Sequence, residues 1–139
     1  MELTDFDCKQ FIAILQEELV PALGCTEPIA IAYAGAHARA LLGKIPDRVC
    51  IESSGNIIKN VKSVTVPNSG NMKGIPAAAA IGIIGGNPDK GLEVLADITE
   101  ADIARTKEFL EKVPCKVSLL DTVASLHFIV EVFAGNDSA

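Results

Sequence analysis

The chain has 139 residues and a formal net charge of -6, with 12 lysines and arginines against 18 aspartates and glutamates. This length suits one ordinary domain, and the lack of a basic stripe or tail argues against nucleic acid as a partner. The mean hydropathy of +0.34 indicates apolar surface that either another subunit, as in a homo-oligomer, or a further part of the protein covers.

The sequence contains no pattern typical of a membrane span or a secretion signal. The longest nearly apolar run, residues 75–86, is too short to cross a bilayer and is interrupted by Pro76 and three glycines. The N-terminus is acidic where a signal peptide needs positive charge. We therefore expect a cytoplasmic protein with no membrane partner.

Residues 4–20 predict the first helix, with Thr4 or Asp5 as its cap. Proline at position 21 cannot continue it. The apolar positions recur at helical spacing, at Cys8, Ile12, Leu15 and Leu19. This stripe makes Cys8 a core residue in the predicted structure.

Cys25 lies at the mouth of the next predicted helix, which spans residues 27–42 and ends at Gly43. Thr26 is the expected N-cap, and Glu27 suits the positive end of the helix. Because this helix is apolar on nearly every side and rich in small residues, we expect it to be buried. A thiol at such a helix start has its thiolate form favoured, and the thiolate is both a nucleophile and a metal ligand. Taken alone, a cysteine is better explained as a small buried residue, and the glycine, cap and charge around Cys25 weaken that explanation.

Two strands and a turn are predicted next. Residues 49–52 read as a strand, residues 53–56 as a hairpin-like turn, and residues 57–66 as an irregular returning strand. In this interpretation Cys50 is an inert strand residue.

A polar loop at residues 67–74 precedes a short, almost wholly apolar helix at residues 75–84. Free backbone N–H groups at the start of a helix attract anions, and a lysine adds positive charge for a carboxylate. Turn chemistry explains the same composition equally well. The candidate binding residues are Asn68, Ser69, Gly70, Asn71 and Lys73.

The rest of the chain predicts two helices and two strands. A short helix at residues 92–98 precedes a helix at residues 100–112, which Thr99 caps with Asp102 at the capping-box position.

The predicted strands cover residues 116–120 and 125–133. The alternation in the second strand is clear, and it places His127 on a mixed face, where we do not expect a catalytic role.

This order of elements predicts one domain over residues 1–139 of the α+β class. Neighbouring strands along the chain favour a small, mostly antiparallel sheet, packed against buried helices rich in small residues. The helices at residues 27–42 and 75–85 should be the most buried ones.

The sequence offers few patterns that carry chemistry. Neither a glycine-rich nucleotide motif nor a serine-nucleophile motif is present, and no spacing favours a catalytic pairing of Cys25 with His37 or His127. The cysteines have no CxxC spacing, so a complete metal site within the chain is poorly supported, whereas one ligand to a site completed elsewhere stays open. The four cysteines are Cys8, Cys25, Cys50 and Cys115.

Two segments, ALGCTEPIAIAYAGA at residues 22–36 and VPNSGNMKGIPAAAAIG at residues 66–82, resemble the N-terminal motifs of the L-cysteine desulfidase family, within the serine dehydratase alpha-chain group. The resemblance extends over essentially the whole chain. Members of that family are considerably longer, so the chain resembles an N-terminal portion of a longer lyase.

The resemblance implies an enzyme that removes sulfide from cysteine, or water from serine, and releases pyruvate and ammonia. It also implies an oxygen-sensitive [4Fe-4S] cluster without pyridoxal phosphate, in which three cysteines hold three irons. Cys25 matches one of these ligands, whereas Cys8, Cys50 and Cys115 match none. The isolated chain should therefore carry no cluster and be inactive, and the remainder of the lyase should be its partner.

Two other classes of function stay open at this point. The chain could serve as a non-catalytic assembly or regulatory module, or as part of an enzyme that uses Cys25 as a nucleophile. The residues do not identify the base that removes a substrate proton, and they do not separate cysteine from serine as the substrate.

Overall fold

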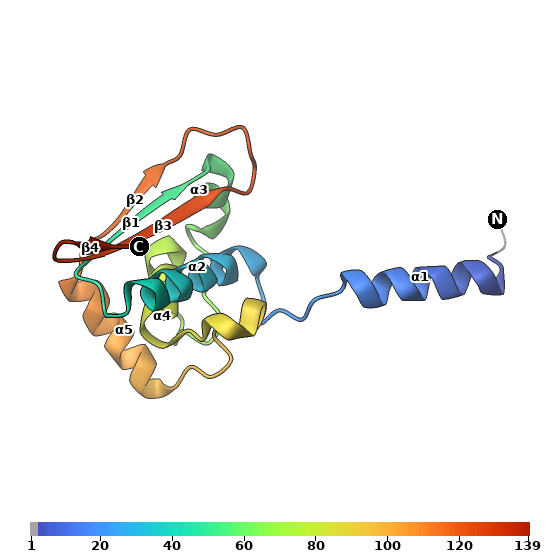
Figure 1. Cartoon of the computed structure of the whole chain (residues 1–139), viewed down its shortest axis with the longest axis horizontal. Coiled ribbons are helices and arrows are strands. Elements are labelled where there is room, and N and C mark those ends of the chain that lie inside the picture. The colour runs from blue at the N-terminus through green and yellow to red at the C-terminus, as the bar shows by residue number, and fades with distance from the viewer. Residues whose placement is uncertain (1–2) are drawn as a thin grey trace.

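The computed structural model describes residues 3–139. Helix α1 (Asp5–Glu18) projects from the rest of the molecule, and a compact body begins at helix α2 (Thr26–Leu42), as Figure 1 shows. Residues 19–25 join the two parts without helix or strand.

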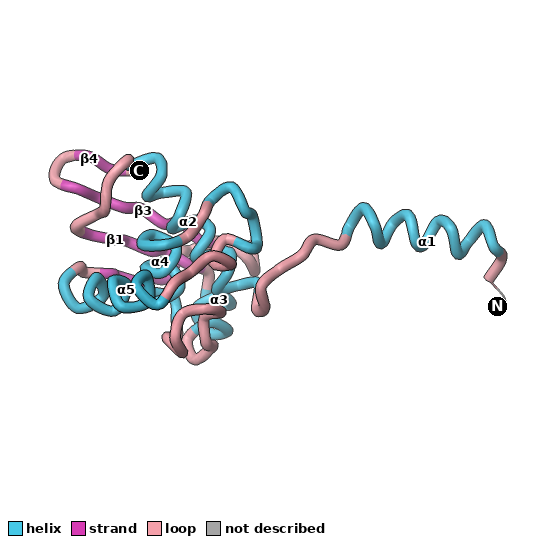
Figure 2. Tube along the Cα trace, turned by 90° about the horizontal axis from the view of Figure 1, so that it is seen from below, coloured by secondary structure: helices cyan, strands magenta, loops and turns pink. Residues whose placement is uncertain are grey.

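The body contains one sheet of four strands in the order β2-β1-β3-β4. The strands are β1 (Arg48–Ser53), β2 (Cys115–Leu119), β3 (Phe128–Ala134) and β4 (Asp137–Ser138). β1 pairs with β3 and β3 with β4 in antiparallel fashion, whereas β1 and β2 are parallel. The predicted α+β class is confirmed, with a mixed sheet, and Figure 2 shows the strands gathered beside the helices.

Two closely packed helices, α2 and α4 (Gly74–Gly85), form the centre of the core. Their backbones nearly touch: a Cβ atom added at Gly82 would lie 2.0 Å from the carbonyl oxygen of Ala32, and one added at Gly35 would lie 2.7 Å from that of Ala79. Small residues permit this approach because they leave no side chain between the two backbones. The prediction that these helices are the most buried is confirmed, since they contain more buried residues than any other described helix.

Helix α5 (Glu100–Lys112) packs on α4 and has the predicted N-terminus. The Thr99 hydroxyl accepts a hydrogen bond from the Asp102 backbone N–H, and the Asp102 carboxylate accepts one from the Thr99 backbone N–H. The preceding segment differs from the prediction, because a 3-10 helix, η1 (Pro88–Glu93), replaces the helix expected at residues 92–98. Gly91 has φ 54, which an α-helix cannot contain.

The turn predicted at residues 53–56 and the strand predicted at residues 57–66 are wrong. Ser54 is the N-cap of helix α3 (Gly55–Val61), in which Ile57 and Val61 are buried. These two residues lie four positions apart and therefore share a helix face, so helical spacing overrides their β-branched preference for strands.

The prediction that Cys8 is a core residue is also wrong. Thr4 caps α1 as expected, and Asp7 completes a capping box with it. Within residues 3–139, however, no residue of α1 is buried, and Cys8 is exposed. The apolar stripe is present on α1, and no other element among the described residues covers it (Figure 1).

The last strands begin and end differently from the prediction. β3 starts at Phe128 instead of residue 125, because the backbone from Ser125 to His127 leaves the sheet and contacts Ser54. After β3 the chain turns and adds β4. Among residues 3–139, no helix is both long and apolar enough to cross a membrane.

Candidate functional site

Cys25 is exposed at the start of α2. Its backbone has φ -62 and ψ 122, so Cys25, and not the predicted Thr26, is the N-cap; Thr26 already has helical geometry. The Cys25 side chain makes no capping hydrogen bond. The Cys25 Sγ donates instead to Glu27 Oε2, at 3.3 Å.

Glu27 connects the start of α2 to α3. Its Oε1 accepts a hydrogen bond from Asn60 Nδ2 at 3.1 Å, while its Oε2 accepts from Cys25. The hydrogen bonds from Cys25 and from Asn60 lower the pKa of Glu27, which therefore stays ionised.

The backbone N–H of Glu27 at the helix start lowers the pKa of the Cys25 thiol, as expected, but other causes outweigh this effect. Partial burial raises the pKa of the Cys25 thiol, and the hydrogen bond to Glu27 raises it further. A thiol that donates to a carboxylate is stabilised in its protonated form, and the negative charge of Glu27 opposes a second negative charge on sulfur.

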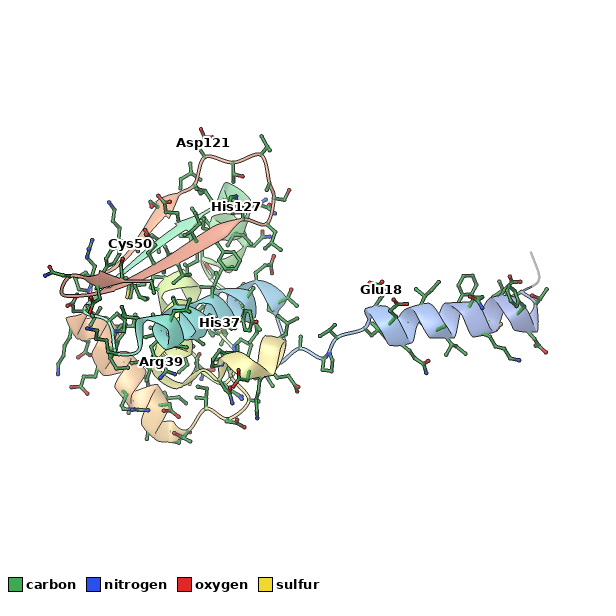
Figure 3. The ribbon with its side chains drawn as sticks, viewed as in Figure 1. Glu18, His37, Arg39, Cys50, Asp121 and His127 are labelled. Atoms are coloured by element: carbon green, nitrogen blue, oxygen red, sulfur yellow. The ribbon has the colours of Figure 1, made fainter. Side chains whose placement is uncertain are left out.

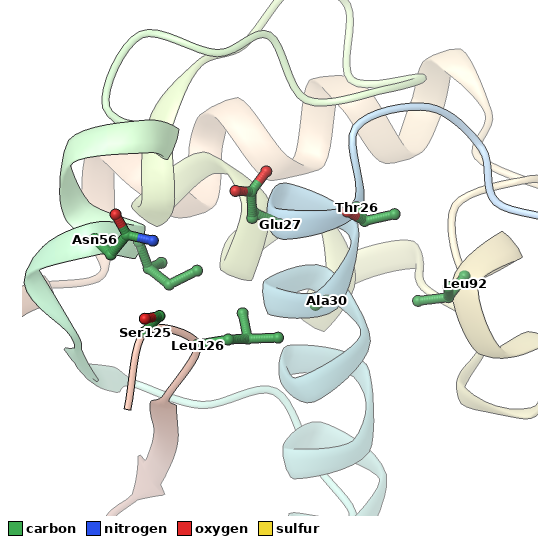
Figure 4. Close-up of a pocket in the computed structure, with 8 residues that line it drawn as sticks. Thr26, Glu27, Ala30, Asn56, Leu92, Ser125 and Leu126 are labelled. Atoms are coloured by element: carbon green, nitrogen blue, oxygen red, sulfur yellow. The ribbon is translucent and has the colours of Figure 1, made fainter. Parts of the chain in front are cut away.

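A cleft of about 370 Å³ lies beside the first turn of α2, as Figure 4 shows. Its wall is mostly apolar, and the Glu27 carboxylate, the Asn56 amide and two hydroxyl groups supply the polar atoms. The residues that line the cleft are Thr26, Glu27, Ala30, Asn56, Ile57, Leu92, Ser125 and Leu126.

The polar loop begins next to Cys25. Gly24 precedes that cysteine and has φ 118, and a Cβ atom added to it would lie 3.1 Å from Pro67 Cγ. The two sequence segments singled out above therefore meet in space at this point.

Two of the five candidate loop residues shape the loop itself. The amide of Asn68 donates to the carbonyl oxygen of Leu95 at 3.0 Å, and the buried hydroxyl of Ser69 donates to that of Val66 at 2.7 Å. These bonds favour the turn explanation for Asn68 and Ser69.

The other three candidates, Gly70, Asn71 and Lys73, are exposed. Lys73 lines a second hollow of about 450 Å³ together with Lys62. We call this hollow the Lys62–Lys73 groove, and it shares no lining residue with the cleft beside Glu27. The start of the loop, at Pro67, thus lies beside Gly24 and Cys25, whereas Lys73 lies in a separate hollow. Binding of a substrate carboxylate by the five loop residues stays a prediction.

Cys25 forms no disulfide in the described part of the chain. Among residues 3–139, no three His, Cys, Asp or Glu side chains are grouped as metal ligands would be. Cys115 lies in the sheet, where burial and then Cys50 raise its pKa to about 11. His127 contacts Thr122, and the His37 ring packs edge-on against Tyr33.

The sequence interpretation missed the bond between Glu27 and Asn60. Asn60 was assigned to the predicted strand at residues 57–66, and that assignment predicts no contact between its side chain and the start of α2. A helical reading of residues 57–61, from the spacing of the isoleucines and Val61, would have brought Asn60 to the end of a helix.

The chain is similar to several curated proteins that all carry the name UPF0597 protein. It is 61% identical to one from Treponema denticola over 91% of this chain, 53% identical to one from Lachnoclostridium phytofermentans over 94%, and 48% identical to one from Desulfitobacterium hafniense over 96%. The chain spans only 30–31% of the length of these relatives. No protein-family model matches the chain, and no solved structure matches it.

The predicted resemblance to the L-cysteine desulfidase family is contradicted by the names of these relatives. Relatives that share about half or more of their aligned residues with the chain are named UPF0597 protein, and no desulfidase name occurs among them.

Proposed function

We propose that this chain is part of a longer cytoplasmic lyase that removes the β-substituent of a small amino acid. The substrate is cysteine or serine, and the products are pyruvate and ammonia with sulfide or water. One observation carries the proposal: the exposed Cys25 thiol donates a hydrogen bond to Glu27, and Glu27 lines a cleft large enough for an amino acid.

Cys25 supplies one ligand of an iron–sulfur cluster in this proposal. A thiol must lose its proton to bind iron. That proton goes to solvent, and the Glu27 carboxylate, whose pKa is lowered, stays ionised beside the ligand. The described residues offer one thiolate here, so the other ligands come from the part that the relatives have beyond the matched region.

The cluster would supply an iron that polarises the leaving group as a Lewis acid. The chain's own contribution is binding: the apolar wall of the cleft contacts the substrate's carbon atoms, and the Glu27 carboxylate attracts its ammonium group. Loss of the α-proton and of the β-substituent gives an enamine. Its imine tautomer is hydrolysed by water to pyruvate and ammonia.

The structure gives less support to a cysteine-nucleophile enzyme. The side-chain partner of Cys25 is a carboxylate whose pKa is lowered, and such a group is a weak base for activating a thiol. A non-catalytic module would still need a reason for the Cys25–Glu27–Asn60 arrangement.

Anaerobic reconstitution with iron and sulfide tests the proposal. The full-length protein, at the length of its relatives, should turn brown, bind about four irons per chain and gain lyase activity. The Cys25→Ala variant should lose both properties. Cys8→Ala removes another exposed cysteine and should keep both.

The isolated 139-residue chain should stay colourless in the same experiment. Stoichiometric iron on this chain would contradict the proposal, as would a Cys25→Ala full-length protein that keeps its cluster and turnover. A colourless full-length protein that is nevertheless an active lyase would refute the role of the cluster alone.

A further inference from the structure

The apolar stripe of α1 requires a partner. Phe11, Ile12 and Leu15 are 51–54% exposed, and Leu19 is 70% exposed. Isolated helices of about 14 residues are marginal in water, because most helix stability in proteins comes from packing of the apolar face. A well-capped helix with its apolar face open is therefore one half of an interface.

The Lys62–Lys73 groove has the matching properties. It runs between the end of α3, the start of α4 and the edge strand β2. Its apolar wall includes Leu119, which is 69% exposed, and its polar side chains are two lysines and a serine. No acidic residue lines it. The lining residues are Ile58, Lys62, Lys73, Gly74, Ile75, Pro76, Val117, Ser118 and Leu119.

The charges of the helix complement those of the groove. Within α1, four acidic residues stand against the single basic residue Lys9. With about 100° of rotation per residue, Asp5, Asp7 and Glu18 flank the stripe, and Glu17 lies on the opposite face. An apolar helix with an acidic border fits an apolar groove bordered by lysines.

We propose that α1 of one copy docks in the Lys62–Lys73 groove of a second copy, with Leu15 as its central apolar contact. Figure 1 shows why the partner is another molecule: α1 projects away from its own body, beyond residues 19–25. Reciprocal exchange gives a closed two-fold dimer, in which the helix–groove contact forms twice. This doubling brings the buried area toward the roughly 1,200–2,000 Å² of stable interfaces.

The inference does not depend on the proposed lyase activity. It gives Lys73 a place in an interface, and so separates Lys73 from the other residues predicted to hold a substrate carboxylate.

Sedimentation of the 139-residue chain over a range of concentrations tests the inference. The wild-type chain should dimerise, and Leu15→Glu should raise the dissociation constant by roughly 30-fold or more, because it places a charge at the centre of the interface. The control Ala13→Glu adds the same charge outside the stripe and should leave the constant within about threefold. A chain without residues 1–18 should be folded by circular dichroism and a monomer by sedimentation.

Charge reversal identifies the groove. Lys62→Glu combined with Lys73→Glu should weaken dimerisation by about tenfold or more. Adding Glu18→Lys to that double variant should recover most of the loss. Glu17→Lys makes the same charge change on the far face of α1 and should not recover it.

Three results would overturn the inference. The first is a monomer at every concentration up to about 1 mM, where even a weak specific contact forms. The second is a dimer that the lysine reversals leave unchanged, which would place α1 against α1 instead. The third is equal recovery of dimerisation by Glu17→Lys and Glu18→Lys. This would show that only the net charge of the chain matters, and not a specific contact of Glu18 with the groove.

Discussion

Helices α1 and α4 both carry apolar residues, yet their surroundings are opposite. Nine residues of α4 are buried, among them Ala77, Ala78, Ile81 and Gly82, whereas α1 has none within the described chain. α4 presents Gly82 to α2, so the two backbones approach directly. α1 has no glycine, and its larger apolar side chains need a groove of matching shape. Apolar content thus predicts that a helix requires cover, and a glycine on the apolar face permits direct contact with a neighbouring helix.

The largest effect is expected where α4 meets α2. Gly82→Ala should lower the free energy of unfolding by more than about 4 kcal/mol, or prevent folding, because its Cβ would lie 2.0 Å from a backbone oxygen. Chemical denaturation followed by circular dichroism measures this loss. Gly55→Ala is the control, since its Cβ meets only Leu119 at 3.7 Å, and it should change the free energy by less than about 1 kcal/mol. A Gly82→Ala chain as stable as wild type would mean that the two helices are not in close contact.

A smaller effect should distinguish the two capping boxes, one in α1 and one in α5. Asp102→Ala should cost about 1–2 kcal/mol of unfolding free energy at pH 7, because the hydrogen bonds to Thr99 and then to Arg105 lower the pKa of Asp102 to about 2. Asp7→Ala should cost the body almost nothing, because α1 does not pack on it.

The pH dependence of this difference follows from the sign of the pKa shift. A carboxylate with a lowered pKa stabilises the fold above its unfolded value, near 3.8, and the stabilisation disappears as the pH falls toward 2. The penalty of Asp102→Ala in denaturation curves should therefore shrink between pH 4 and pH 2. A penalty that stays constant over this range would assign the effect to helix propensity and not to the ionised cap.

The smallest effect concerns the two exposed cysteines, Cys8 on α1 and Cys25 on the body. Glu27→Gln removes the negative charge that helps to raise the pKa of Cys25, so Cys25 alkylation at pH 8 should speed up by about two- to fivefold. Cys8 is the internal reference and should keep its rate. Mass spectrometry of the alkylated peptides gives both rates, and an unchanged rate at Cys25 would show that burial alone sets its pKa.

Much of the fold follows from local patterns that the sequence displays. The α1 and α5 caps, the C-terminal glycine of α2 and the buried helix α4 all depend on neighbouring residues, and each is present as predicted. α3 was missed because β-branched residues favour strands, while burial of Ile57 and Val61 on one helix face decides the outcome.

The candidate site was less predictable because its contacts join distant segments. Cys25 was identified from its neighbours, but its protonation depends on Glu27, whose second oxygen is held by Asn60 from another helix. Likewise the separation of Lys73 from Asn68 depends on how the loop is folded against Leu95. Figure 3 illustrates the same limit for the histidines: His37 and His127 lie in different parts of the body.

The central position of β1 has a consequence for synthesis of the chain. Both neighbours of β1, the parallel β2 and the antiparallel β3, come later in the sequence, at residues 115–119 and 128–134. During translation β1 is therefore complete long before either partner strand exists, and both of its hydrogen-bonding edges stay open. An unpaired strand edge is a template for pairing with other chains. Newly made protein is therefore most prone to aggregate in the interval between emergence of β1 and emergence of β3.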